Sequence, residues 1–207
     1  MEQLSYERKK VFDPLLRMIH VWNGVLITIQ IFTALIADYI EKGIQRDTLW
    51  HIHVWIGYGI AIGLLSRLIW GVIGPNSAKF SDLWHPQVWI NFIKTRKWLD
   101  PERWGHSTMA SAAYLLFYLL LIVMVLTGLS LAAIKLNMGP LDGLLGGNKS
   151  LKDLFHEPHE LIYNFFWAFI LVHIAALIWH EVKDKTPLAQ AMVSGYLYRV
   201  IKKHDKE

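Results

Sequence analysis

The sequence predicts an all-α membrane protein, a bundle of four transmembrane helices. Crossing a bilayer needs roughly 20 mainly apolar residues, and four stretches meet this length. They lie at residues 21–40, 54–73, 110–134 and 161–179, and Asp38 and Arg67 are their charged residues. Of the 207 residues 54% are hydrophobic and only 18% are Asp, Glu, Lys or Arg. This composition excludes a disordered chain, a coiled coil and an ordinary soluble enzyme.

Helix start signals extend these stretches. Asp13 followed by Pro14 predicts the start of the first helix, because Asp caps helices and Pro fits the first helical position. Asp47 or Thr48 is expected to cap the second helix, and a capping-box-like Ser150–Asp153 precedes the fourth. The predicted transmembrane helices therefore span about 14–40, 48–74, 108–134 and 157–182, within a single domain of residues 1–207.

Two connecting segments have recognisable composition. Residues 84–99 place Trp84, Trp89 and Trp98 among polar residues, which predicts a helix lying in the membrane interface between the second and third crossings. Residues 135–151 are rich in glycine and predict an external loop.

The basic residues predict the orientation. Fifteen Lys and Arg residues lie before the first crossing, between the second and third, and after the fourth, whereas five lie in the other loops. The positive-inside rule therefore places both termini in the cytoplasm. The sequence contains no nucleic-acid-binding motif, and we read the pI of about 9.2 as a property of these flanks.

Cysteine is absent from the chain. Its absence excludes disulfides, thiolate zinc sites, cysteine-ligated iron–sulfur clusters and covalent haem attachment. Iron–sulfur or nickel centres would have to belong to another chain.

Four histidines fall at membrane depth in two layers. His20 lies about six residues into the first helix, and His173 lies near the inner end of the fourth. His53 lies about six residues into the second helix, and His159 lies at the outer end of the fourth. Fourteen residues separate His159 from His173, so both face one side of the helix, roughly 21 Å apart along it. Polar residues inside a membrane are costly and usually functional.

This layering predicts two haems, each held by two imidazoles from facing helices. The inner haem would take His20 and His173 as iron ligands, and the outer haem would take His53 and His159. Gly24 and Gly57 each follow a ligand by four residues, where a missing side chain would let a flat porphyrin approach.

Other readings of these residues stay open. An intramembrane histidine can simply hydrogen-bond a neighbouring helix, and His156 is the main rival to His159. Arg67, fourteen residues after His53, could pair with a propionate of the inner haem or extend to the interface. Gly59, Gly63 and Gly128 read as helix-packing positions, and we also expect them to offer contacts to a partner's membrane helix.

Several stretches form recognisable motifs and are spread nearly end to end. They are Val11-Phe12-Asp13-Pro14 with Arg17-Met18-Ile19-His20, His53-Val54-Trp55-Ile56-Gly57 with Arg67-Leu68-Ile69-Trp70, Gly105-His106 with Thr127-Gly128, His156-Glu157-Pro158-His159 with His173, and Met192-Val193-Ser194-Gly195-Tyr196. With these stretches the chain resembles the bacterial cytochrome b561-type proteins, most closely the membrane cytochrome b subunit of nickel–iron uptake hydrogenases. One departure is Ser107-Thr108 after Gly105-His106, where those subunits carry Asn-Pro, and it leaves the soluble partner open.

The resemblance implies four helices, two b haems, the same four histidine ligands and quinone chemistry in the bacterial inner membrane. Electrons would enter from a periplasmic dehydrogenase, expected to be the small and large subunits of a hydrogenase, and would leave to a quinone. Membrane lipid surrounds such a subunit, and a dimer of complexes is implied. The rival readings are the cytochrome b of a thiosulfate-reductase-like complex, a self-contained superoxide:quinone oxidoreductase, and a haem-free anchor or metal transporter.

Overall fold

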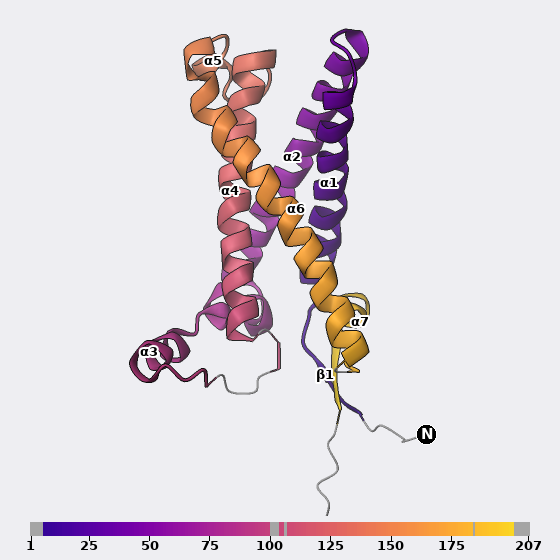
Figure 1. The fold of residues 1–207 in the computed structure, drawn as a ribbon, viewed down its shortest axis with the longest axis vertical. Helices are drawn as coiled ribbons and strands as arrows, with labels where there is room; N and C mark the ends of the chain where they lie inside the picture. The colour runs from indigo at the N-terminus through magenta and orange to yellow at the C-terminus, as the bar shows by residue number, and fades with distance from the viewer. Residues whose placement is uncertain (1–5, 100–103, 106, 184, 201–207) are drawn as a thin grey trace, which may run out of the picture. The chain divides into compact units, whose positions relative to one another are not determined.

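The computed structural model describes residues 6–99, 104–105, 107–183 and 185–200. Four long helices dominate it (Figure 1). Each is long and apolar enough to cross a membrane, which confirms the predicted helical membrane fold. They are α1 (Pro14–Tyr39), α2 (Ile44–Ile73), α4 (Thr108–Leu136) and α6 (Lys152–Lys183).

Short elements connect these helices. The strands and the shorter helices are β1 (Tyr6–Lys10), η1 (Asn76–Ala78), η2 (Phe80–Leu83), α3 (Pro86–Thr95), α5 (Asp142–Leu145), η3 (Lys149–Leu151), α7 (Leu188–Ser194) and β2 (Tyr196–Val200). The element α3 corresponds to the predicted interfacial helix, and it ends where Arg96 adopts a left-handed conformation with φ 57°. The predicted glycine-rich loop contains α5 and η3.

The chain divides into two compact units. The first unit comprises the described parts of Met1–Met18, Ile69–Tyr114 and Phe169–Glu207. The second unit comprises Ile19–Leu68 and Leu115–Ala168. Each unit is described by itself below.

The first unit contains a two-stranded antiparallel sheet that the sequence did not predict. In this sheet Tyr6 lies opposite Val200, and Lys10 lies opposite Tyr196. Gly195 precedes β2 with φ 83°, and a Cβ added there would lie 2.7 Å from the carbonyl oxygen of Phe12. A side chain at position 195 would thus meet both backbone strain and a clash.

The start of α1 is fixed within the same unit. A carboxylate oxygen of Asp13, Oδ1, accepts the Leu16 backbone N–H at 3.0 Å and the indole N–H of Trp70 at 3.1 Å. The first bond confirms the predicted cap. The second ties the cap to the end of α2. The apolar cluster around them consists of Val11, Phe12, Leu16, Ala78, Ala191 and Leu197, with Trp70, Trp104, Leu188 and Met192 packed against it.

In the second unit, glycines let α1 and α2 approach closely. A Cβ on Gly63 would lie 2.1 Å from Oδ1 of Asn23, and one on Gly59 would lie 2.8 Å from Cδ1 of Leu26. The indole N–H of Trp22 donates to the Gly59 carbonyl at 2.9 Å. These glycines pack within this chain, as predicted. Side chains of α1 lie against Gly59 and Gly63, and the expectation that these glycines and Gly128 contact a partner's helix stays a prediction.

Two helices begin earlier than predicted. The helix α2 starts at Ile44, and Thr48 lies inside it, donating its hydroxyl to the Ile44 carbonyl at 2.8 Å. The helix α6 starts at Lys152 and continues through Pro158. The Ser150 hydroxyl donates to Oδ1 of Asn148 at 2.6 Å, and this local bond takes the place of the predicted capping box.

Candidate haem site

A cavity of about 600 Å³ lies in the second unit between α1, α2, α4 and α6. This volume is in the range of small-molecule and cofactor sites, which are mostly apolar with a few placed polar groups. His53 from α2 and His159 from α6 both line it. The structure therefore brings the two predicted outer ligands to one cavity.

The ring of His53 is held by a neighbouring helix. Its Nδ1 lies 3.0 Å from the hydroxyl oxygen of Thr33 on α1, and Thr33 is only 8% exposed. The ring of Trp50, one turn earlier on α2, meets the imidazole edge to face with centroids 5.4 Å apart. Both contacts restrict rotation of the imidazole.

The ring of His159 is held in the same way. Its Nδ1 lies 2.9 Å from the hydroxyl oxygen of Thr127 on α4, and Thr127 is 7% exposed. The neighbouring Gly128 leaves room for the ring, since a Cβ there would lie 3.1 Å from Cε1 of His159. The two histidines are thus held in the same way, each by a threonine of a neighbouring helix.

The rival ligand His156 also lines the cavity. Its Nδ1 lies 3.7 Å from Oε2 of Glu160, one turn along the same helix, and its side chain is 40% exposed. A carboxylate on the same helix positions this ring less firmly than a hydroxyl from a neighbouring helix. The geometry favours His159 as the outer ligand.

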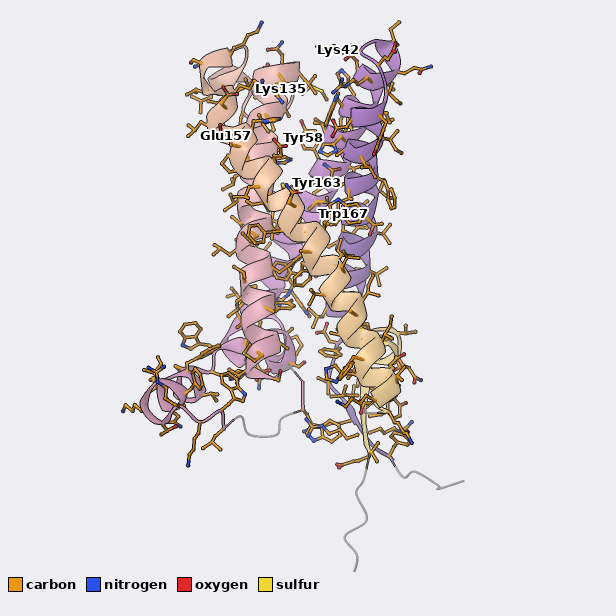
Figure 2. The ribbon with its side chains drawn as sticks, in the orientation of Figure 1. Lys42, Tyr58, Lys135, Glu157, Tyr163 and Trp167 are labelled. Carbon is orange, nitrogen blue, oxygen red and sulfur yellow. The ribbon has the colours of Figure 1, made fainter. Side chains whose placement is uncertain are left out.

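Polar groups at the cavity wall could receive the acidic edge of a cofactor. The Tyr58 hydroxyl and Oε1 of Gln30 are buried without a hydrogen-bond partner among the described residues, and both residues line the cavity together with Lys135 and Arg46. In Figure 2, Lys135 lies above Tyr58, toward the end of α4 that leads into α5. A phenol and an ammonium group are suitable partners for a propionate.

The donor set fits a haem. In the described part of the chain, no group of three or more His, Cys, Asp or Glu could hold a metal ion. Two imidazoles suffice for a haem iron, however, because the porphyrin supplies the other ligands. Gly57 on α2 and Gly128 on α4 line the cavity, and the side chains nearest to them are those of Gln30 and His159.

The predicted inner ligands lie in different units, His20 in the second and His173 in the first. His173 stacks on Phe169, with ring centroids 5.9 Å apart and planes 8° from parallel. A Cβ on Gly24, four residues after His20, would meet nothing within 4 Å. The inner pair therefore stays a prediction from the sequence.

Arg67 is enclosed by protein rather than extended to the surface. It is 2% exposed, and its guanidinium carbon lies 5.8 Å from the ring centroid of Tyr118 on α4. This burial disfavours the reading in which Arg67 reaches the membrane interface. Its contact with a propionate stays a prediction.

Sequence reasoning did not single out Thr33 and Thr127 as partners of the ligands. Each is a hydroxyl-bearing residue within an apolar stretch, and this position was the only feature of the sequence that could have indicated a role for it. Membrane helices often carry Thr bonded to their own backbone, so a contact with a histidine of another helix was visible only in three dimensions.

Comparison with known proteins identifies the family of this chain. The profile of the family described as prokaryotic cytochrome b561 matches residues 11–195. A relative from Cupriavidus necator is 28% identical over 162 residues, covering 70% of this chain and 65% of the relative. A relative from Rhodobacter capsulatus is 24% identical over 209 residues, covering 90% and 80%. A third, from Azotobacter vinelandii, is 24% identical over 166 residues, covering 70% and 66%.

All three relatives are named probable Ni/Fe-hydrogenase B-type cytochrome subunits. The match to the Cupriavidus protein spans about 65% of that protein's length. No solved structure matches this chain. The family match covers most of the chain, and the fold has the four helices such a protein needs. The chain belongs to the prokaryotic cytochrome b561 family and is a multi-pass b-type cytochrome of the bacterial inner membrane.

Proposed function

We propose that this protein carries two b haems and passes electrons from a periplasmic hydrogenase to the quinone pool. One observation carries the proposal: His53 and His159 line a single cavity of about 600 Å³, each with Nδ1 held by a threonine of another helix. The haem supplies one-electron chemistry when bound, and the protein supplies ligation, burial and orientation.

The chain's residues have distinct roles at the outer haem. His53 and His159 would bind the iron through Nε2, because Nδ1 of each ring is already engaged. Gly128 leaves room for the His159 ring beside the cavity. Tyr58 lies at the cavity with a buried hydroxyl that has no partner in the described chain, and it would donate to a propionate.

The inner haem would be bound by His20 and His173. This part of the proposal rests on the two-layer spacing in the sequence. Arg67, on the same helix as His53 and buried, would compensate the charge of an inner propionate. A buried cation with such a partner is less costly than one without.

The relatives' names support the assignment of the electron donor. They call those proteins Ni/Fe-hydrogenase cytochrome subunits, and this chain has no cysteine for iron–sulfur or nickel ligation. The hydrogenase small and large subunits would supply those centres. The quinone would react near the predicted inner interface, where Trp84 and Trp98 are exposed.

Purification of the complex from membranes tests this function. We expect two haems b per chain, extractable by acid acetone because no cysteine attaches them. We expect hydrogen to reduce both haems when the hydrogenase subunits co-purify, and a quinone analogue to reoxidise them. One haem per chain in a fully loaded preparation, or haems that hydrogen does not reduce in the intact complex, would contradict the proposal.

A further inference from the structure

The two outer histidines share a feature that the ligand assignment alone does not explain. Each ring meets a threonine hydroxyl from a different helix: Thr33 on α1 for His53 on α2, and Thr127 on α4 for His159 on α6. Both threonines are less than a tenth exposed. What the contact does depends on which group donates the proton.

For Thr33, a backbone contact indicates which group donates the proton. Its hydroxyl donates to the Gln30 carbonyl of its own helix at 2.8 Å. A hydroxyl has a single proton, so once that proton is donated the oxygen can only accept. With the Thr33 proton on the Gln30 carbonyl, Nδ1–H of His53 is the donor in the 3.0 Å contact, which corresponds to the tautomer with a lone pair on Nε2.

Thr127 repeats the arrangement. Its hydroxyl lies 2.8 Å from the Val123 carbonyl and 3.0 Å from the Met124 carbonyl, and it donates to this pair. The oxygen is again left as an acceptor, and Nδ1–H of His159 donates to it at 2.9 Å. With Nδ1 as the donor, Nε2 carries a lone pair and can bind iron, whereas in the reversed arrangement Nε2 would carry the proton.

We propose that Thr33 and Thr127 are positioning residues that fix His53 and His159 in the Nδ1–H tautomer, so that each ring directs the lone pair of Nε2 into the cavity. Metal-bound histidines commonly donate their second N–H to such a partner, which sets the tautomer and raises the basicity of the coordinating nitrogen. Here the acceptors are neutral hydroxyls anchored by their own helices. The inference rests on the proposed function, because it assigns a role relative to the outer haem.

This arrangement predicts an effect on the redox potential as well as on binding. Donation from Nδ1–H makes Nε2 a stronger electron donor, which favours oxidised iron. A threonine-to-valine change replaces the hydroxyl by a methyl group of similar size and removes the hydroxyl acceptor. The outer haem should then bind more weakly, by about 10- to 100-fold, and titrate at a higher potential.

The experiment compares Thr33→Val and Thr127→Val with Thr33→Ser and Thr127→Ser in the purified full chain. Haem affinity is measured by titrating haem into chain produced without it, and the outer-haem potential by spectroelectrochemistry. Thr28→Val is the matched control, because Thr28 on the same helix as Thr33 makes the same kind of backbone bond, to Gly24 at 2.8 Å, but is exposed.

We expect both valine variants to weaken binding of the outer haem and raise its potential, and both serine variants and Thr28→Val to match the parent protein. A purely structural role would lower stability without moving the potential. Valine variants with unchanged affinity and potential would overturn the inference, as would serine variants that behave like valine.

Two further variants separate this inference from the proposed function. If His53→Ala and His159→Ala retain the outer haem, the ligand assignment fails and the threonine inference falls with it. If both lose the outer haem while the valine variants titrate as the parent does, the inference alone fails.

Discussion

Gly128 lies directly against the ring of His159, so that a Cβ added to the glycine would be 3.1 Å from Cε1 of the imidazole. The preceding residue, Thr127, holds Nδ1 of the same ring. Two adjacent residues of α4 therefore fix the position of one side chain of α6, one by hydrogen bonding and the other by leaving space.

Gly128→Ala should displace the His159 ring by a few tenths of an ångström, because the added methyl group has no other space. We expect weaker binding of the outer haem and a loss of about 1–3 kcal/mol in unfolding free energy, measured by haem titration and by denaturation in detergent. Gly143→Ala is the control, since a Cβ there meets nothing within 4 Å. Equal behaviour of the two variants would contradict the packing argument.

Replacing His159 by Ala should remove the outer haem, whereas replacing His156 should leave it. The reason is that His159 is held by Thr127, while His156 lies beside Glu160 and is partly exposed. Haem counts and reduced-minus-oxidised spectra of the two variants measure this. Loss of the haem only in His156→Ala would assign the ligand to position 156 instead.

Removing the positive charge of Lys135 should lower the potential of the outer haem, because a nearby cation favours the form that carries the additional electron. Lys135→Gln is the test, and Lys135 lines the cavity. Lys42→Gln is the matched control, because Lys42 lies in the connection between α1 and α2 and is exposed. If a redox titration gives the same outer-haem potential for both variants, the charge of Lys135 does not act on the haem.

Arg67→Leu should lower the potential of the inner haem, by the same charge argument. Arg67→Lys keeps the charge and should shift the potential less, although it loses the planar guanidinium that lies over Tyr118. The measurement is a titration that resolves the two haems by their spectra. An unchanged inner-haem potential in Arg67→Leu would make Arg67 a packing residue.

The helical fold could be predicted because each of its causes is local. Apolar length predicted the four crossings, and Asp13-Pro14 predicted the start of α1, where Asp13 caps the Leu16 N–H. The outer histidines could be placed at one depth by counting residues, and the structure brings both to one cavity.

The sheet and the threonine contacts could not be predicted, because they depend on residues far apart in sequence. The strand β1 reads as an exposed basic segment, and nothing local shows that it pairs with β2. Thr33 lies 20 residues from His53, and Thr127 lies 32 residues from His159. The start of α2 was misplaced because Thr48, expected as a cap, bonds to the helix backbone from within the helix.

The pairing of β1 with β2 also has a kinetic consequence. Tyr6 cannot meet Val200 until the ribosome has released nearly the whole chain and the intervening helices have entered the bilayer. Contacts of such high sequence separation are slow to form, because they close the longest loop in the chain. The strand pair should therefore form last in biogenesis, and its protection from amide exchange would mark completed insertion.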